Sequence, residues 1–254
     1  MKTAIVIPAR HASARLPGKP LLRETGKYLI QHVYERASQS RRAGEVVVAT
    51  DDPRIVAAVE SFGGKVQLTR RDHPSGTDRV AEVARELEVD VVINLQGDEP
   101  LIDPGSLDRL ADLMAAHPEA DMATLAVPIA TNEQWHNPNC VKVVCSTDGR
   151  ALYFSRSPMP HVRDGQPDFA GRPARFLQHL GLYAYRKSFL LELAALPPEP
   201  LEQLEKLEQL RVLGSGRQIY VGVVQHTAIG VDTMEDYREF VRIYRTSRRK
   251  KQAA

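Results

Sequence analysis

Residues 3–95 alternate between short apolar runs and longer stretches with the spacing of amphipathic helices. Four of the apolar runs have the character of strands buried on both faces, at 3–8, 45–50, 66–69 and 89–95. Three helical stretches lie between them, at 29–40, 54–62 and 77–87. This alternation predicts an α/β fold with a doubly wound, mostly parallel sheet and right-handed crossovers.

The second half of the chain follows a different pattern. Residues 139–146 and 151–155 flank a Thr-Asp-Gly turn and predict a β-hairpin. Further strands are expected at 178–186 and 219–224, and further helices at 188–196, 201–213 and 233–246. We therefore expect a mixed-sheet extension of the first half inside one domain, 1–254, with the parts 1–128, 129–232 and 233–254.

Polar loops follow the four strands of the first half. They cover residues 9–20, 50–53, 72–79 and 96–100. In open parallel sheets, ligands bind beyond the carboxyl ends of the strands. This edge of the sheet is therefore the candidate site.

Bulk composition excludes several classes of protein. A formal net charge of +2 over 254 residues does not favour a nucleic-acid binder, and no apolar run approaches the roughly 20 residues that span a bilayer. Met1 to Pro8 has the character of a buried strand and not of a signal peptide, so a cytoplasmic protein is expected. Cys140 and Cys145 are expected to serve neither a disulfide nor a zinc site.

The loop after the first strand carries three cations, Arg10, Arg15 and Lys19, with Gly18 beside the last of them. Main-chain N–H groups and cationic side chains in such a loop suit the phosphates of a triphosphate. The spacing matches neither a P-loop nor a dinucleotide fingerprint. A solvated basic loop is the alternative interpretation.

Two acidic positions are candidates for a metal site. Asp98 lies in a Gln-Gly-Asp-Glu-Pro turn after the fourth strand, where a carboxylate can hold a hard cation against phosphate oxygens. Its alternative role is a helix cap, although Glu99 and Asp103 suit that role better. Asp232, in Gly-Val-Asp-Thr-Met-Glu-Asp, resembles a helix-capping segment on composition alone.

Nine blocks, in this order along the chain, together resemble the 3-deoxy-D-manno-octulosonate (Kdo) cytidylyltransferases, also called CMP-Kdo synthetases. They cover residues 7–10 with 15–21, 50–52, 75–79, 94–100, 137–143, 153–158, 179–186, 207–211 and 230–233. The resemblance implies a sheet like that of the nucleotide-diphospho-sugar transferases. It also implies transfer of CMP from CTP to the anomeric C2 hydroxyl of Kdo, with release of pyrophosphate, for lipopolysaccharide synthesis.

The resemblance assigns roles to individual residues. Arg10, Arg15 and Lys19 would hold the CTP phosphates, and Asp98 and Asp232 would bind Mg²⁺, which activates the sugar hydroxyl without a protein base. Positions similar to those that meet the nucleotide are Ala9, Arg10, Lys19, Ser75, Gly76, Arg79 and Gln96. Positions similar to those that bind the sugar are Gln96, Arg156, His179, Tyr183, Glu208 and Gln209. A homodimer is implied as well.

Several alternatives stay open. His179 and Tyr183 are equally compatible with structural roles, and Glu208 lies in a run typical of a solvated helix face. His11, His32, His73 and His226 are left without a role. Gln178 and Met159 depart from the family pattern, which leaves a C8-amino analogue of Kdo open as the substrate.

Three rival functions differ more widely. A CMP-sialic acid synthetase is disfavoured because the loop reads Arg-His-Ala-Ser-Ala-Arg, and a nucleotide-sugar-dependent glycosyltransferase because Asp98 follows Gln-Gly and not Asp-x. The basic run 248–251 is typical of a disordered, solvated chain end and not of a nucleic-acid or membrane-surface site.

Overall fold

The computed structural model describes residues 1–12, 16–225 and 230–252. The chain forms two compact units, Met1–Asp108 with Ala228–Ala254, and Arg109–Thr227. Residues 109–128 were expected to belong to the first half, but they lie in the second unit, because the strand Met122–Pro128 (β5) pairs with strands there. The prediction of a single domain stays a prediction.

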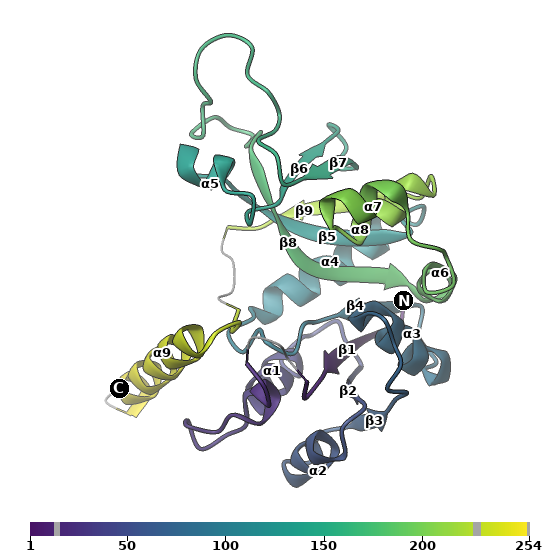
Figure 1. The fold of residues 1–254 in the computed structure, drawn as a ribbon, viewed down its shortest axis with the longest axis vertical. Helices are drawn as coiled ribbons and strands as arrows, with labels where there is room; N and C mark the ends of the chain where they lie inside the picture. Colours follow the sequence, from purple (N-terminus) through teal and green to yellow (C-terminus); the bar gives the residue numbers. More distant parts are fainter. Residues whose placement is uncertain (13–15, 226–229, 253–254) are drawn as a thin grey trace. The chain divides into compact units, whose positions relative to one another are not determined.

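The first unit contains a parallel four-stranded sheet in the order β3-β2-β1-β4 (Figure 1). Its strands are β1 (Thr3–Ala9), β2 (Glu45–Thr50), β3 (Val66–Leu68) and β4 (Val91–Asn94). Its helical segments are η1 (Lys19–Leu21), α1 (Leu29–Ala37), α2 (Pro53–Ser61), α3 (Gly76–Glu86) and α9 (Met234–Gln252). The parallel alternation predicted for this half is confirmed.

Central β1 explains why this sheet is parallel. Residues Ala4 to Ile7 are wholly buried, and Ile5 lies opposite Val46 on one side and Ile93 on the other. A strand that is covered on both faces needs side chains that are apolar at successive positions. Helices joined by short loops then bring each next strand back in the same direction.

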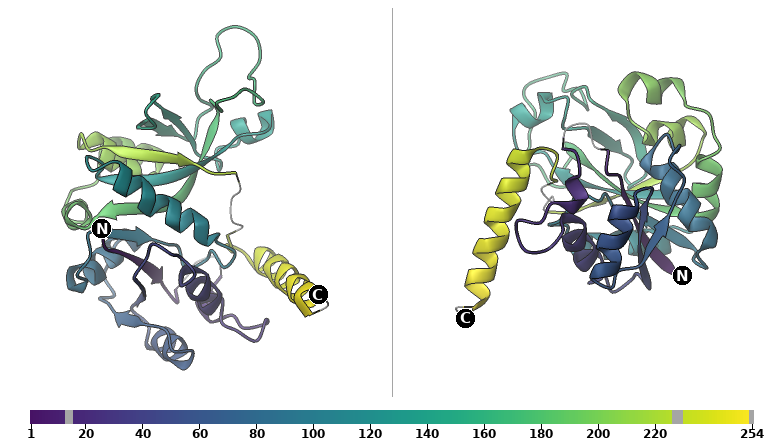
Figure 2. Two further views of the ribbon diagram at one scale, coloured as in Figure 1. Left: turned by 180° about the vertical axis from the view of Figure 1, so that it is seen from behind. Right: turned by 60° about the horizontal axis from the view of Figure 1, so that its bottom comes forward.

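Helix α9 is longer than predicted. The helix was expected to end at Thr246 and to be followed by a disordered tail. Instead it continues to Gln252. Arg, Lys and Gln favour helix, and no Gly or Pro interrupts residues 234–252. Figure 2 shows one uninterrupted yellow helix. Its apolar side, which includes Tyr237, Phe240 and Val241, packs with Leu16 and Leu29 in the first unit.

The second unit is a mixed sheet. Strand β8 (Leu177–Arg186) runs antiparallel to β5 (Met122–Pro128), and β9 (Ile219–Val223) runs parallel to β5 on its other side. The predicted hairpin is confirmed as β6 (Lys142–Cys145) with β7 (Ala151–Ser155), and β6 also pairs with β8. A long loop joins β7 to β8 (Figure 1).

The helices expected at 188–196 and 201–213 are shorter than predicted. The predicted helix 201–213 is two helices, α7 (Pro200–Glu205) and α8 (Gln209–Gly214), because Lys206 takes a left-handed conformation with φ 55°. The other helices are α4 (Pro104–Ala116), α5 (Asn132–His136) and α6 (Lys187–Leu193). Among the described residues, every helix is too short or too polar to cross a bilayer.

Candidate active site

One cation and two carboxylates from distant parts of the sequence meet in the first unit. Lys19 Nζ lies 2.7 Å from Asp98 Oδ2 and 3.6 Å from Asp232 Oδ1. It also donates to the main-chain oxygen of Val231 at 2.8 Å. The sequence separation between Lys19 and Asp98 is 79 residues, so only the fold brings these groups together.

Two glycines permit this convergence. Gly18, directly before η1, has a φ of 70°, a left-handed conformation that glycine adopts without strain. At Gly97, a Cβ would lie 2.9 Å from the main-chain oxygen of Pro8, so only glycine lets this turn approach the end of β1 so closely. Asp98 O then accepts a hydrogen bond from Val231 N at 2.8 Å, which fixes the C-terminal segment beside the turn.

The capping arrangement expected at residues 232–236 is confirmed, but its capping residue is Thr233 and not Asp232. Thr233 is the capping residue: its hydroxyl accepts from Asp236 N at 3.2 Å, and Asp236 Oδ2 accepts from Thr233 N at 2.8 Å. The Asp232 carboxylate points instead to within 3.6 Å of Lys19 Nζ. Asp98 likewise pairs with Lys19, while α4 begins later, at Pro104.

The same pair of carboxylates fits a divalent cation. Both lie beside one positive group, the Lys19 ammonium, so a cation already occupies the space that they share. Within the described ranges, no three His, Cys, Asp or Glu side chains gather into a metal site. Magnesium commonly takes one or two carboxylates and completes its shell with water and substrate phosphates, which matches this donor set.

Arg10 directly follows β1. Its Nη2 donates to the main-chain oxygens of His73 at 2.8 Å and Ser75 at 2.9 Å. Ser75 caps α3: its hydroxyl accepts from Asp78 N at 3.2 Å and donates to Asp78 Oδ2 at 2.6 Å. Gly76 opens α3 close to Pro8, so the helix N-terminus, which favours anions, lies at the end of β1.

Arg79 is buried inside the protein, whereas a residue that contacts a ligand is expected to be accessible. It is wholly buried, its Nη1 donates to Thr69 Oγ1, and its Nη2 lies 3.3 Å from Asp51 Oδ2. Burial lowers the pKa of Arg79, and the Asp51 carboxylate opposes that change. Within the described residues, its Nε and Nη2 make no hydrogen bond. Its predicted contact with the nucleotide stays a prediction.

The remaining predicted nucleotide residues lie at the same edge. Ala9 ends β1 and is buried, and Gln96 follows β4, where its Nε2 lies 3.4 Å from Asn94 Oδ1. Arg15 lies outside the described residues.

Three of the predicted sugar-binding residues meet in the second unit. His179 Nε2 lies 3.0 Å from Thr124 Oγ1, and its Nδ1 lies 3.5 Å from Gln209 Nε2. Tyr183 donates from its hydroxyl to Gln209 Oε1 at 3.3 Å. Burial lowers the pKa of His179 to about 3, so its ring is neutral at pH 7. The neutral ring can donate a hydrogen bond to one hydroxyl and accept one from another, but it cannot form an ion pair with a carboxylate.

Glu208 affects Tyr183 electrostatically, whereas the hydrogen bonds of Arg156 go to other residues. Burial raises the pKa of Tyr183, and the Glu208 carboxylate adds to the rise. Arg156 donates to main-chain oxygens instead: Nε to Glu205 at 2.7 Å and Nη1 to Pro138 at 3.0 Å. None of its hydrogen bonds among the described residues reaches His179 or Tyr183.

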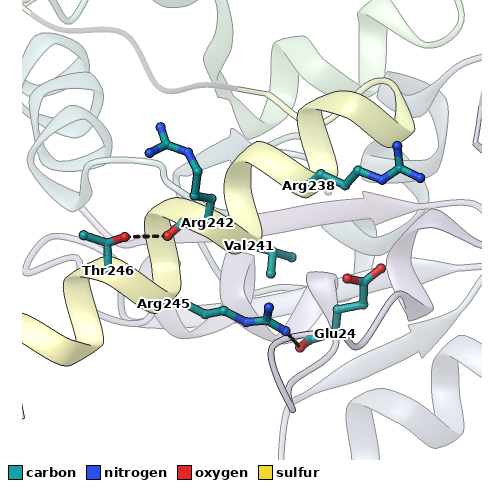
Figure 3. Close-up of a pocket in the computed structure, with 6 residues that line it drawn as sticks. All are labelled: Glu24, Arg238, Val241, Arg242, Arg245 and Thr246. Atoms are coloured by element: carbon teal, nitrogen blue, oxygen red, sulfur yellow. Dashed lines mark hydrogen bonds between the residues drawn. The ribbon is translucent and has the colours of Figure 1, made fainter.

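A separate hollow of about 370 Å³ lies beside α9 in the first unit (Figure 3). Its lining residues are Glu24, Arg238, Val241, Arg242, Arg245 and Thr246. Arg242 pairs with Glu239 through 2.5 and 2.7 Å contacts, and Arg245 donates to Glu24 O at 3.0 Å. The arginines of this hollow are therefore largely engaged, and none of the predicted site residues lines it.

Comparisons with known proteins agree with this geometry. A family model described as cytidylyltransferase matches residues 4–219. A 3-deoxy-manno-octulosonate cytidylyltransferase from Rhodopirellula baltica is 53% identical over 243 residues, covering 94% of this chain and 97% of the relative. One from Syntrophotalea carbinolica is 50% identical over 239 residues, covering 93% and 96%.

The fold has a solved counterpart. A structure of CMP:2-keto-3-deoxy-manno-octonic acid synthetase complexed with CTP superposes with a TM-score of 0.90 at 47% identity, covering 97% of this chain and 100% of that one. A cytidylyltransferase from Leptospira borgpetersenii, at 20% identity and a TM-score of 0.62, shares the fold.

Proposed function

The chain belongs to the cytidylyltransferase family, and we propose that it transfers CMP from CTP to the anomeric hydroxyl of Kdo, giving CMP-Kdo and pyrophosphate. The observation that carries this proposal is the convergence of Lys19, Asp98 and Asp232 at the end of a parallel sheet. A basic loop and two carboxylates at one strand edge are the groups that nucleotidyl transfer needs.

The transfer is an in-line displacement at the α-phosphorus of CTP. The C2 oxygen of the sugar forms the new P–O bond, the bond from the α-phosphorus to the bridging oxygen breaks, and pyrophosphate leaves with that electron pair. The hydroxyl proton passes to solvent. Arg10 and Lys19 balance the negative charge of the phosphates and hold them in line for attack.

Asp98 and Asp232 would hold Mg²⁺. When bound, this ion lowers the pKa of the attacking hydroxyl and withdraws charge from the phosphate oxygens. The Lys19 ammonium offsets one of the two negative charges of Asp98 and Asp232. We propose that Lys19 leaves Asp98 for the phosphates when CTP binds, because an ammonium and a metal ion beside the same carboxylates repel each other.

The hydroxyls of the sugar would be bound by uncharged groups. Gln209, Tyr183 and neutral His179 form a hydrogen-bonded cluster that offers both donors and acceptors to hydroxyls. We propose that Arg156 meets the sugar carboxylate, since its side-chain hydrogen bonds within the described residues go to main-chain oxygens and not to a carboxylate.

A substrate panel tests the proposal directly. Pyrophosphate release from CTP is followed with Kdo, its C8-amino analogue and N-acetylneuraminate, each with and without Mg²⁺. Turnover should be fastest with Kdo and should require the metal. Turnover of N-acetylneuraminate in place of Kdo, or transfer from a nucleotide sugar without pyrophosphate release, would contradict the proposal.

We also propose a cytoplasmic homodimer, because CTP is a cytoplasmic metabolite and the second unit carries exposed apolar side chains. Leu152 on β7 is 56% exposed, Leu204 on α7 is 79% exposed and Val223 on β9 is 44% exposed. Light scattering of the purified protein should give twice the chain mass of 28.3 kDa. A mass of one chain at micromolar concentration would contradict the dimer.

A further inference from the structure

The turn 70–73, which lies between β3 and α3, is fastened by the Glu82 carboxylate of α3. Glu82 accepts from the main-chain nitrogen of Arg70, with both carboxylate oxygens at 3.3 Å, and it contacts His73 Nε2 closely. The side chain of His73 is only 4% exposed and that of Glu82 is 22% exposed. This pair therefore holds both ends of the turn 70–73.

The same segment determines where Arg10 points. The guanidinium donates through Nη2 to the oxygens of His73 and Ser75, which flank Pro74. Ser75 is held from the other side by its capping interaction with Asp78. Within the described residues, the His73 carbonyl has no such contact with α3, so its position depends on how the imidazole is held.

We infer that the His73–Glu82 pair is a positioning element for CTP binding, which aims Arg10 at the phosphates through the main-chain oxygen of His73. The inference rests on the proposed function, because it takes Arg10 as a phosphate ligand. Neither His73 nor Glu82 touches the substrate in this arrangement. His73 was without a role on sequence alone, because its partner Glu82 is nine residues away.

The energetic reason is preorganisation. A long arginine side chain loses rotamer freedom when it binds a phosphate, and a side chain that is already held in place loses less. Burial alone would raise the pKa of Glu82, but hydrogen bonds from His73 and Arg70 outweigh it, so its pKa lies below the ordinary value. Glu82 is therefore ionised at pH 7, and a charged acceptor strengthens its hold on the imidazole.

Two substitutions at His73 separate positioning from bulk packing. His73→Leu keeps an apolar side chain of similar size but removes the hydrogen bond, and it should weaken CTP binding about tenfold, as expected for a lost bond to a charged group. His73→Gln retains a donor and should stay within about threefold of the wild type. Calorimetric titration with CTP and Mg²⁺ measures both, and Glu86→Gln, an exposed carboxylate on the same helix, is the matched control.

A double-mutant cycle with Arg10→Ala decides whether the effect passes through Arg10. In the Arg10→Ala background, His73→Leu should change CTP affinity by less than about twofold, because the side chain to be positioned is gone. The KM for Kdo should not change in the single variant. Full additivity, or equal losses from leucine and glutamine, would overturn the inference.

A second variant distinguishes loss of folding from loss of CTP binding. If His73→Leu does not fold, Glu82→Asp, which shortens the carboxylate by one methylene, takes its place in the same cycle. If the wild type binds CTP but makes no CMP-Kdo, the proposed sugar substrate fails, while the binding cycle still decides the role of His73.

Discussion

The two predicted ligand regions are built from opposite kinds of side chain. At the end of β1 and β4, the side chains of Lys19, Asp98 and Asp232 are charged and 12%, 30% and 48% exposed. In the second unit, His179 and Gln209 are buried and half-buried Tyr183 is bonded to Gln209, and the shifted pKa values of His179 and Tyr183 keep both rings neutral at pH 7.

The difference teaches how one chain can treat two substrates differently. Charges near the surface attract a polyanion and a cation strongly and can exchange partners, because water compensates each group as it moves. Buried neutral groups cannot be left without partners at low cost, so they reject ligands whose hydroxyls do not match. We therefore expect the first region to govern rate and metal use and the second to govern choice of sugar.

Asp98→Asn should have the largest effect, because it removes charge from the predicted metal site while keeping its shape. We expect kcat for CMP-Kdo formation to fall by on the order of 10²–10³-fold, the usual cost of losing one electrostatic contact to the transition state. Raising Mg²⁺ should not restore it. Glu60→Gln, an exposed carboxylate on α2, serves as the control, and near-normal turnover of Asp98→Asn would refute the assigned role.

Lys19→Met should reduce activity and increase metal affinity at the same time. Without the ammonium, kcat/KM for CTP should fall by on the order of 10–100-fold, as expected for a lost charged contact. The carboxylates of Asp98 and Asp232 should then bind Mn²⁺ more tightly in the absence of nucleotide, which electron paramagnetic resonance can measure. Unchanged or weaker Mn²⁺ binding would show that Lys19 does not compete with the metal.

The neutral state of His179 gives a prediction on pH and stability. Its pKa is about 3 in the folded protein and near 6.5 in the unfolded chain, so below pH 6.5 the unfolded state binds the extra proton. Folding stability should therefore fall as pH drops from 6.5 toward 3 and should be unaffected by this group above 6.5. His179→Gln should flatten the dependence by about 1–3 kcal/mol between pH 6.5 and 4.5.

Chemical denaturation at several pH values measures that change, with exposed His136→Gln as the control. An unaltered slope in His179→Gln would mean that the ring is already protonated in the folded state. The KM for Kdo in the wild type should also show no step that belongs to His179 between pH 5 and 8.

Truncation after Ser247 should have the smallest effect. The apolar residues of α9 that pack into the first unit, Tyr237, Phe240 and Val241, all precede the cut. We expect kcat and both KM values within about twofold of the wild type, as for most surface changes. A large loss of activity would show that the basic end contacts a substrate or a partner.

Much of the site could be predicted because its residues follow local sequence signals, namely buried strands and glycine turns. Asp98 follows a buried strand and a glycine, and Lys19 follows Gly18, so the loops of a parallel sheet were expected to meet. The capping arrangement expected at residues 232–236 is confirmed, with Thr233 and Asp236 forming the cap, while the Asp232 carboxylate lies beside Lys19. Composition cannot distinguish which of two adjacent polar residues faces the helix.

Periodicity and turn residues in the sequence were sufficient to locate the strands of the first half, the helices between them and the loops that carry the chemistry, because each of these shows its pattern within a window of about 11–18 residues. Only the tertiary structure decided that Lys19 lies between Asp98 and Asp232, that the helix at 201–213 breaks at Lys206, and that Glu82 holds His73. These features arise from contacts between side chains whose burial and charge depend on the whole fold, and no local pattern encodes them.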